Sequence, residues 1–78
     1  MIEGDRVTLT EAMEDLTEGM VGTVVNVRNN IDYERDCFIA PGNPCLAVQF
    51  DERNYPSVNR KVDGKWMKVI DKCKKIEA

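Results

Sequence analysis

The stretch that decides the fold is Glu18-Gly19-Met20-Val21-Gly22-Thr23-Val24-Val25-Asn26-Val27. β-Branched residues run through it, and successive side chains fall on alternate faces, which is the pattern of a strand rather than a helix. Gly19 ends the preceding loop at a position where a positive φ is expected. Gly22 lies inside the strand and marks a bend, a bulge or a close approach by another backbone.

The rest of the chain supplies partners for this strand. Period-2 alternation and flanking turn residues predict further strands over residues 5–10, 45–50, 65–69 and 74–77. Residues 11–18 form an acidic loop with Met13 and Leu16 tucked inward, and residues 51–59 form a polar loop. Asp63-Gly64 predicts a tight turn. A single helical turn over residues 70–73 precedes the last strand.

Five short strands in a chain of 78 residues must curl to hide their edges. The expected fold is therefore all-β: one domain, residues 1–78, forming a small five-stranded antiparallel barrel with a short helical turn near the C-terminus. Its predicted core comprises Val7, Leu9, Val21 or Val24, Val25, Leu46, Val48, Phe50, Val69 and Ile76.

Residues 66–76 also fit another structure. Trp66, Val69, Ile70, Cys73 and Ile76 have the spacing of an amphipathic helix. In the barrel interpretation, Trp66 is instead half-buried beneath the sheet.

Charge is distributed unevenly along the chain. The formal charge is −3, but residues 1–20 hold six acids and one arginine, whereas residues 60–78 hold seven bases and three acids. The simplest interpretation is that the two ends face each other across one sheet and pair loosely. The alternative is a polarised surface that steers a charged partner.

Side chains for catalysis are scarce. Histidine is absent, which removes the usual general base and excludes Ser-His-Asp and Cys-His nucleophile systems. The glycine-rich stretch lacks the Lys-Ser/Thr of a phosphate-binding loop and continues as a strand. We therefore expect no enzyme activity and no catalytic residues.

The cysteines number three, Cys37, Cys45 and Cys73, with no C-x-x-C pair. An odd count favours reduced thiols in the core or in loops, and a structural zinc site usually takes four Cys or His ligands, so no metal site is predicted. Two alternatives remain: a Cys37–Cys45 disulfide, and a zinc site built from all three cysteines and one carboxylate.

Targeting segments are not expected. No apolar run approaches the roughly 20 residues of a membrane span, and the first residues resemble neither a signal peptide nor a transit peptide. The predicted compartment is the cytoplasm, or a plastid stroma after removal of a transit peptide.

Several short motifs resemble those of SH3-like barrels. They are Gly4-Asp5-Arg6-Val7, Gly19-Met20, Gly22-Thr23-Val24-Val25-Asn26-Val27, Ile39-Ala40-Pro41 and Val48-Gln49-Phe50-Asp51-Glu52-Arg53. The pattern is similar to the variable chain of ferredoxin–thioredoxin reductase. It is more weakly similar to the SH3-fold subunit of photosystem I and to KOW domains.

The resemblance implies a non-catalytic accessory subunit that holds a protein partner carrying an iron–sulfur cluster and a redox disulfide. It implies that this chain itself binds no cofactor. The predicted partner-binding residues are Glu11, Glu14, Asp15, Glu18, Tyr33, Arg53 and Tyr55. The alternative is a KOW-like module that binds RNA, the ribosome or RNA polymerase. It would use the basic C-terminal residues Lys68, Lys72, Lys74 and Lys75.

Overall fold

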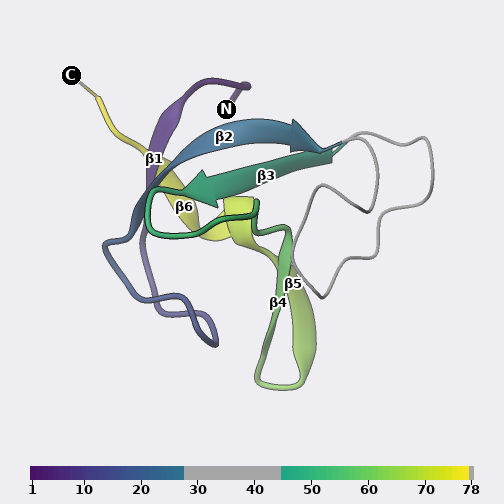
Figure 1. The fold of residues 1–78 in the computed structure, drawn as a ribbon. Helices are drawn as coiled ribbons and strands as arrows, with labels where there is room; N and C mark the ends of the chain where they lie inside the picture. The colour runs from purple at the N-terminus through teal and green to yellow at the C-terminus, as the bar shows by residue number, and fades with distance from the viewer. Residues whose placement is uncertain (28–44, 78) are drawn as a thin grey trace.

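The computed structural model describes residues 1–27 and 45–77, which form an all-β structure with one short helix (Figure 1). The elements are β1 (Arg6–Leu9), β2 (Val21–Val27), β3 (Cys45–Phe50), β4 (Asn59–Val62), β5 (Lys65–Lys68), the 3₁₀ helix η2 (Val69–Lys72) and β6 (Cys73–Lys75). The prediction of an all-β fold is confirmed.

Two antiparallel sheets make up this structure. The larger has the strand order β3-β2-β1-β6, and the smaller is the β4–β5 hairpin. A bridge between Val48 and Ser57 links β3 to the segment that leads into the hairpin, and the Val69 amide donates to the Val58 carbonyl at 3.0 Å. Among the described residues neither sheet closes into a barrel.

β2 lies inside the larger sheet, between β1 and β3, as its sequence predicts. Gly19 has φ 91°, the positive value expected at the end of the loop. Gly22 lies opposite Phe50, and a Cβ there would come within 2.8 Å of the Gln49 carbonyl oxygen. Close approach by β3 is therefore the reason for glycine at this position.

The β4–β5 hairpin turns at Asp63-Gly64, whose φ values are 51° and 79°. Two consecutive positive φ values are what a type I′ hairpin turn requires, so the turn prediction is confirmed. β4 was not among the predicted strands, because its sequence Asn-Arg-Lys-Val has no apolar alternation. The polar loop predicted over residues 51–59 is also partly wrong, since Ser57 and Val58 are buried.

The amphipathic-helix alternative for residues 66–76 is wrong. Trp66 lies on β5, η2 spans one turn and β6 follows. The helical turn and final strand predicted by the barrel interpretation are confirmed, with shifts of one residue at their starts. β6 pairs with β1, so the basic C-terminal segment lies beside the N-terminal strand.

The main core lies between the larger sheet, the acidic loop and η2. It contains Val7, Leu9, Met13, Leu16, Met20, Val24, Val48, Phe50, Val69 and Cys73. Val24 rather than Val21 faces this core, and Val25 instead packs against a second cluster of Val27, Ala47 and Val58. The expectation that Ile76 is buried is wrong: it is 40% exposed because it lies beyond the end of β6. Trp66 is 47% exposed, close to the expected half burial, but it lies on the β4–β5 hairpin opposite Lys61 rather than beneath the sheet.

Candidate interaction surface

The acidic loop, residues 11–18, folds back on itself as a tight turn. Met13 and Leu16 exchange backbone hydrogen bonds of 2.9 and 2.8 Å, and both side chains are buried. The prediction that they point inward is confirmed. Glu14 and Asp15 occupy the tip, where Glu14 adopts φ 53°, a left-handed conformation rare for residues other than glycine.

Asp15 anchors this tip to a distant part of the chain. Its Oδ1 accepts a 2.7 Å hydrogen bond from Arg60 Nε, and its Oδ2 accepts one of 3.0 Å from Arg53 Nη1. Arg53 Nη2 also donates to the Asp15 carbonyl oxygen at 2.6 Å. One carboxylate thus joins the acidic loop to β4 and to the loop that follows β3.

Arg60 is the largest fully buried side chain among the described residues. Besides Asp15, its guanidinium donates to the Asn59 carbonyl at 2.8 Å and to Ser57 Oγ at 3.3 Å, and Glu14 Oε2 lies 4.0 Å from Nε. A buried charge persists only when it is paired and hydrogen-bonded in this way. We call Asp15, Arg53 and Arg60 the arginine clamp.

The charge of Asp15 is stabilised by the clamp. Partial burial raises the pKa of this carboxyl, but the hydrogen bond and positive charge of Arg60, with the charge of Arg53, outweigh burial. The pKa of Asp15 is therefore lower than its ordinary value, and the ionised form holds the loop.

The structure brings several of the predicted partner-binding residues together. Asp15 pairs with Arg53, and Glu14 lies near Arg60 of the same clamp. Tyr55, two residues after Arg53, is 53% exposed. Glu18 is exposed at the end of the acidic loop. Glu11 pairs instead with Lys72 on the other side of the loop, at 3.1 Å. Tyr33 lies outside the described residues.

The basic C-terminal residues divide into two groups. Lys72 and Lys75 pair with the N-terminal acids Glu11 and Asp5, at 3.1 and 3.7 Å. These contacts bear out the interpretation that the two charged ends face each other across one sheet. Lys68 is exposed on the hairpin, and Lys74 is exposed on β6.

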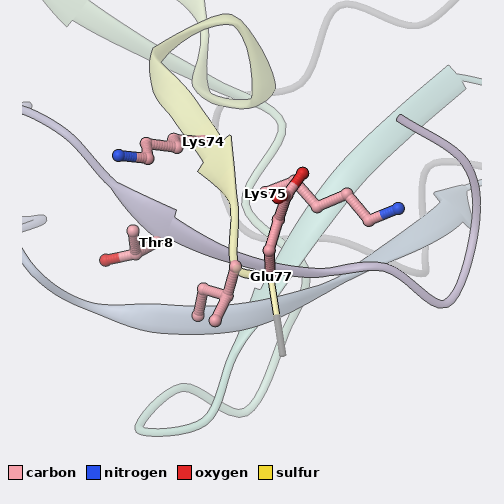
Figure 2. A pocket seen from close by; sticks show the side chains of 5 residues that line it. Thr8, Lys74, Lys75 and Glu77 are labelled. Carbon is pink, nitrogen blue, oxygen red and sulfur yellow. The ribbon is translucent and has the colours of Figure 1, made fainter.

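An open groove of about 740 Å³ lies at the β6 edge of the larger sheet (Figure 2). Thr8, Lys74, Lys75, Ile76 and Glu77 line it. The two lysine side chains point in opposite directions, away from each other. A short edge strand bearing lysines is a common protection against unwanted strand pairing, so the groove by itself indicates no ligand.

The motif residues that resemble SH3-like barrels make contacts within the fold. Arg6 donates to both carboxylate oxygens of Asp51 at 2.9 and 2.8 Å, and to Thr23 Oγ1 at 2.9 Å. Arg53, from the same motif as Asp51, belongs to the clamp. These positions therefore explain how the strands are held in register.

Cys73 is a buried free thiol whose Sγ lies 3.4 Å from the Val69 carbonyl oxygen. Burial raises its pKa to about 11, so the group is a protonated core residue rather than a nucleophile. The proposed Cys37–Cys45 disulfide involves Cys37, which lies outside the described residues. No three metal-ligating side chains gather in the described ranges 1–27 and 45–77.

Sequence reasoning missed the buried arginine and the position of the tryptophan on the hairpin. A charged residue in an Asn-Arg-Lys-Val strand gives no sign of burial, although the Asp63-Gly64 turn that follows could have placed Arg60 in a hairpin. The described residues contain no helix of sufficient length and hydrophobicity to cross a membrane.

Comparison with protein-family models, with curated proteins and with solved structures found no match for this chain.

Proposed function

We propose that the chain is a non-catalytic protein-interaction module with an SH3-like barrel architecture. The strand order β6-β1-β2-β3 supports this architecture, as does the single helical turn η2 directly before the last strand. The resemblance of the motifs suggests a more specific role. In that role the chain is an accessory subunit that docks a redox partner, as the variable chain of ferredoxin–thioredoxin reductase does.

The observation that carries the proposal is the arginine clamp. It fixes a loop that holds four acids, Glu11, Glu14, Asp15 and Glu18, beside the loop that carries Tyr55. Glu14, next to the clamp residue Asp15, adopts φ 53° in the turn that the Met13 and Leu16 backbone hydrogen bonds close. Residues kept in sparsely populated conformations by their surroundings cluster at binding sites.

The side chains on this surface indicate what kind of partner it would bind. Glu14 and Glu18 are exposed carboxylates, and Tyr55 is an exposed ring of the kind that concentrates binding energy at interfaces. A protein that presents lysine or arginine side chains around an apolar contact would complement them. Asp15 and Arg53 hold this surface in place rather than contact the partner, because each already binds the other.

A pull-down from lysate with a matched control tests the proposal. The test variant combines Glu14→Gln, Glu18→Gln and Tyr55→Ala, which replace none of the three clamp residues. The control carries Glu3→Gln, an exposed acid in the N-terminal segment. We expect the wild type and the control to retain the same protein, with or without nuclease, and the triple variant to lose it. Equal retention by all three would contradict the proposal.

The KOW-like alternative is supported at fewer positions. Of its four lysines, Lys68 and Lys74 are exposed, whereas Lys72 and Lys75 have acidic partners. It predicts captured material that disappears on nuclease treatment and weakens when Lys68 and Lys74 are replaced by glutamine.

A further inference from the structure

The outward face of the β4–β5 hairpin combines an aromatic ring with cations. Lys61 lies opposite Trp66, and Asn59 lies opposite Lys68. Because directly opposed residues share a face, and so do residues two apart on one strand, these four side chains share one face. We call Asn59, Lys61, Trp66 and Lys68 the Trp66 face.

The inward face of the same hairpin holds it to the body of the protein. Arg60 and Met67 lie opposite each other, and Arg60 reaches Asp15 from β4. Val62 and Met67 pack against the main core. The Trp66 face therefore points away from the core, on a hairpin that projects beyond the larger sheet (Figure 1).

Trp66, the chain's single tryptophan, is exposed to solvent. It is 47% exposed, and Lys61 Nζ lies 5.9 Å from the centroid of its ring. Lys61 and Lys68 are both exposed, and in the ranges 1–27 and 45–77 no carboxylate lies within salt-bridge distance of either. These two lysines thus differ from Lys72 and Lys75.

Charge also separates this face from the rest of the molecule. Residues 59–68 contain four bases and one acid in a chain whose formal charge is −3. Arg60 is neutralised by Asp15 on the inward side, so Lys61, Lys65 and Lys68 against Asp63 leave the exposed hairpin positive. An anionic ligand is the complement of such a surface.

We propose that the Trp66 face binds single-stranded nucleic acid, with a base stacked on the indole ring and neighbouring phosphates contacting Lys61 and Lys68. A nucleotide carries a flat aromatic group and an anion in one unit, which matches a ring flanked by cations. An acidic peptide would satisfy the lysines but would bring no planar group to the exposed part of the indole. Asn59 adds an amide at the edge of the face, within the same register.

This site does not depend on the proposed protein-interaction function. The clamp lies on the inward side of the hairpin and the Trp66 face on the outward side, so each can be disrupted without touching the other.

Fluorescence reports binding directly because Trp66 is the single tryptophan. We expect an oligouridylate of about 12 nucleotides, within the usual site size of such surfaces, to quench Trp66 emission in a saturable titration. A duplex of the same length and polyglutamate serve as competitors. Displacement by polyglutamate at equal charge would overturn the proposal in favour of an acidic protein partner, and absence of saturable quenching would overturn it outright.

Variants separate stacking from charge, with fluorescence anisotropy of a labelled oligouridylate as the readout. Trp66→Leu should weaken binding by about fivefold or more, and Trp66→Phe by less, because base–aromatic stacking is the larger contribution. The Lys61→Gln/Lys68→Gln variant should flatten the dependence of log affinity on log salt by about 0.7 for each lost phosphate contact.

Lys74→Gln is the control, since Lys74 is an equally exposed lysine on β6. Each variant should keep the wild-type circular dichroism spectrum, because its side chain points away from the core. If Lys74→Gln weakens binding as much as the hairpin substitutions do, the binding is non-specific charge attraction and the proposal is wrong.

Discussion

At the scale of single residues, the main feature of the structure is the pair of Arg60 and Asp15. Arg60 is fully buried, and its Nε donates to Asp15 Oδ1 at 2.7 Å. Such a pair contributes little net stability relative to apolar residues, but breaking it from one side leaves a charge without its partner.

Asp15→Ala should therefore destabilise the protein by about 2 kcal/mol, less than the loss of a fully buried pair because Asp15 is itself one-third exposed. Arg60→Met keeps much of the buried volume and removes the charge, so it should cost less, about 1 kcal/mol. Urea denaturation of the two variants measures the difference. An Arg60→Met variant less stable than Asp15→Ala would show that the clamp is not held together as described.

Glu14, in contrast, is a residue whose replacement should stabilise the protein. Its φ of 53° suits glycine better than glutamate. We expect Glu14→Gly to raise the free energy of unfolding by about 0.5–1 kcal/mol while removing one proposed contact carboxylate. Thermal denaturation and the pull-down would together show a more stable protein that binds its partner less. A destabilised Glu14→Gly variant would mean that relief of the turn does not outweigh loss of the carboxylate beside Arg60.

At the scale of elements, the contact between β2 and β3 fixes the larger sheet. A Cβ on Gly22 would lie 2.7 Å from Val48 Cγ1, 2.8 Å from the Gln49 carbonyl oxygen and 2.9 Å from Phe50 Cα. Two of these three atoms belong to the backbone, which cannot rotate aside.

Gly22→Ala should consequently cost about 2–3 kcal/mol, the upper range for overpacking. Gly64→Ala is the matched control. A Cβ at Gly64 meets nothing within 4 Å, so this variant bears only the strain of φ 79° and should cost about 1 kcal/mol. Equal losses in urea denaturation would argue against close approach of the two strands.

The elements that could be predicted from the sequence are those with a local physical cause. β2 has β-branched residues at five of its seven positions, and Asp63-Gly64 carries the residues that a type I′ turn demands. β4 was missed because it lacks apolar alternation and because its buried Arg60 is paired with Asp15, 45 positions away in the chain.

The predicted positions of Ile76 and Trp66 were wrong for a similar reason, because they depend on where a strand ends and on its register. Ile76 follows the alternation that would bury it, but β6 ends at Lys75 and the side chain remains at the open edge. Trp66 was expected beneath the sheet, yet the register places it opposite Lys61 on the outward face of the hairpin. For the candidate site, the sequence supplied the acidic loop, Arg53 and Tyr55, but not the buried arginine that joins them.

At the scale of the whole molecule, three carboxylates with lowered pKa values tie separate parts of the chain together. The pKa of Asp5 is lowered chiefly by the backbone amide of Ile2, and that of Asp51 by hydrogen bonds from Arg6. Asp15 has a lowered pKa despite burial, because of Arg60 and Arg53. Each carboxyl therefore binds its proton more weakly in the folded state than in the unfolded chain.

The free energy of unfolding should accordingly be constant at neutral pH and fall below about pH 4, the ordinary pKa range of aspartate. The contribution of these groups is complete above the unfolded pKa and is lost as the pH drops through the lowered folded values. Urea titrations from pH 7 to pH 2, with Asp51→Asn as the comparison, test this. The variant should show a shallower loss, and a wild type that is equally stable at pH 2 and pH 7 would contradict the assignment.

The molecule thus has two surfaces of opposite character on the two sides of one hairpin. Arg60 on the inward side fixes the acidic loop proposed to hold a protein, and Trp66 on the outward side lies between the lysines proposed to hold nucleic acid. The larger sheet, through β1 and β6, pairs the acidic and basic ends of the chain.

The most direct test of these assignments is one pull-down from lysate, with and without nuclease, on three proteins. They are the wild type, the Glu14→Gln/Glu18→Gln/Tyr55→Ala variant and the Lys61→Gln/Trp66→Leu/Lys68→Gln variant. We predict that the acidic-loop variant loses a nuclease-resistant protein that the hairpin variant retains. Retention of that protein by the acidic-loop variant, at the wild-type level, would contradict the proposed function.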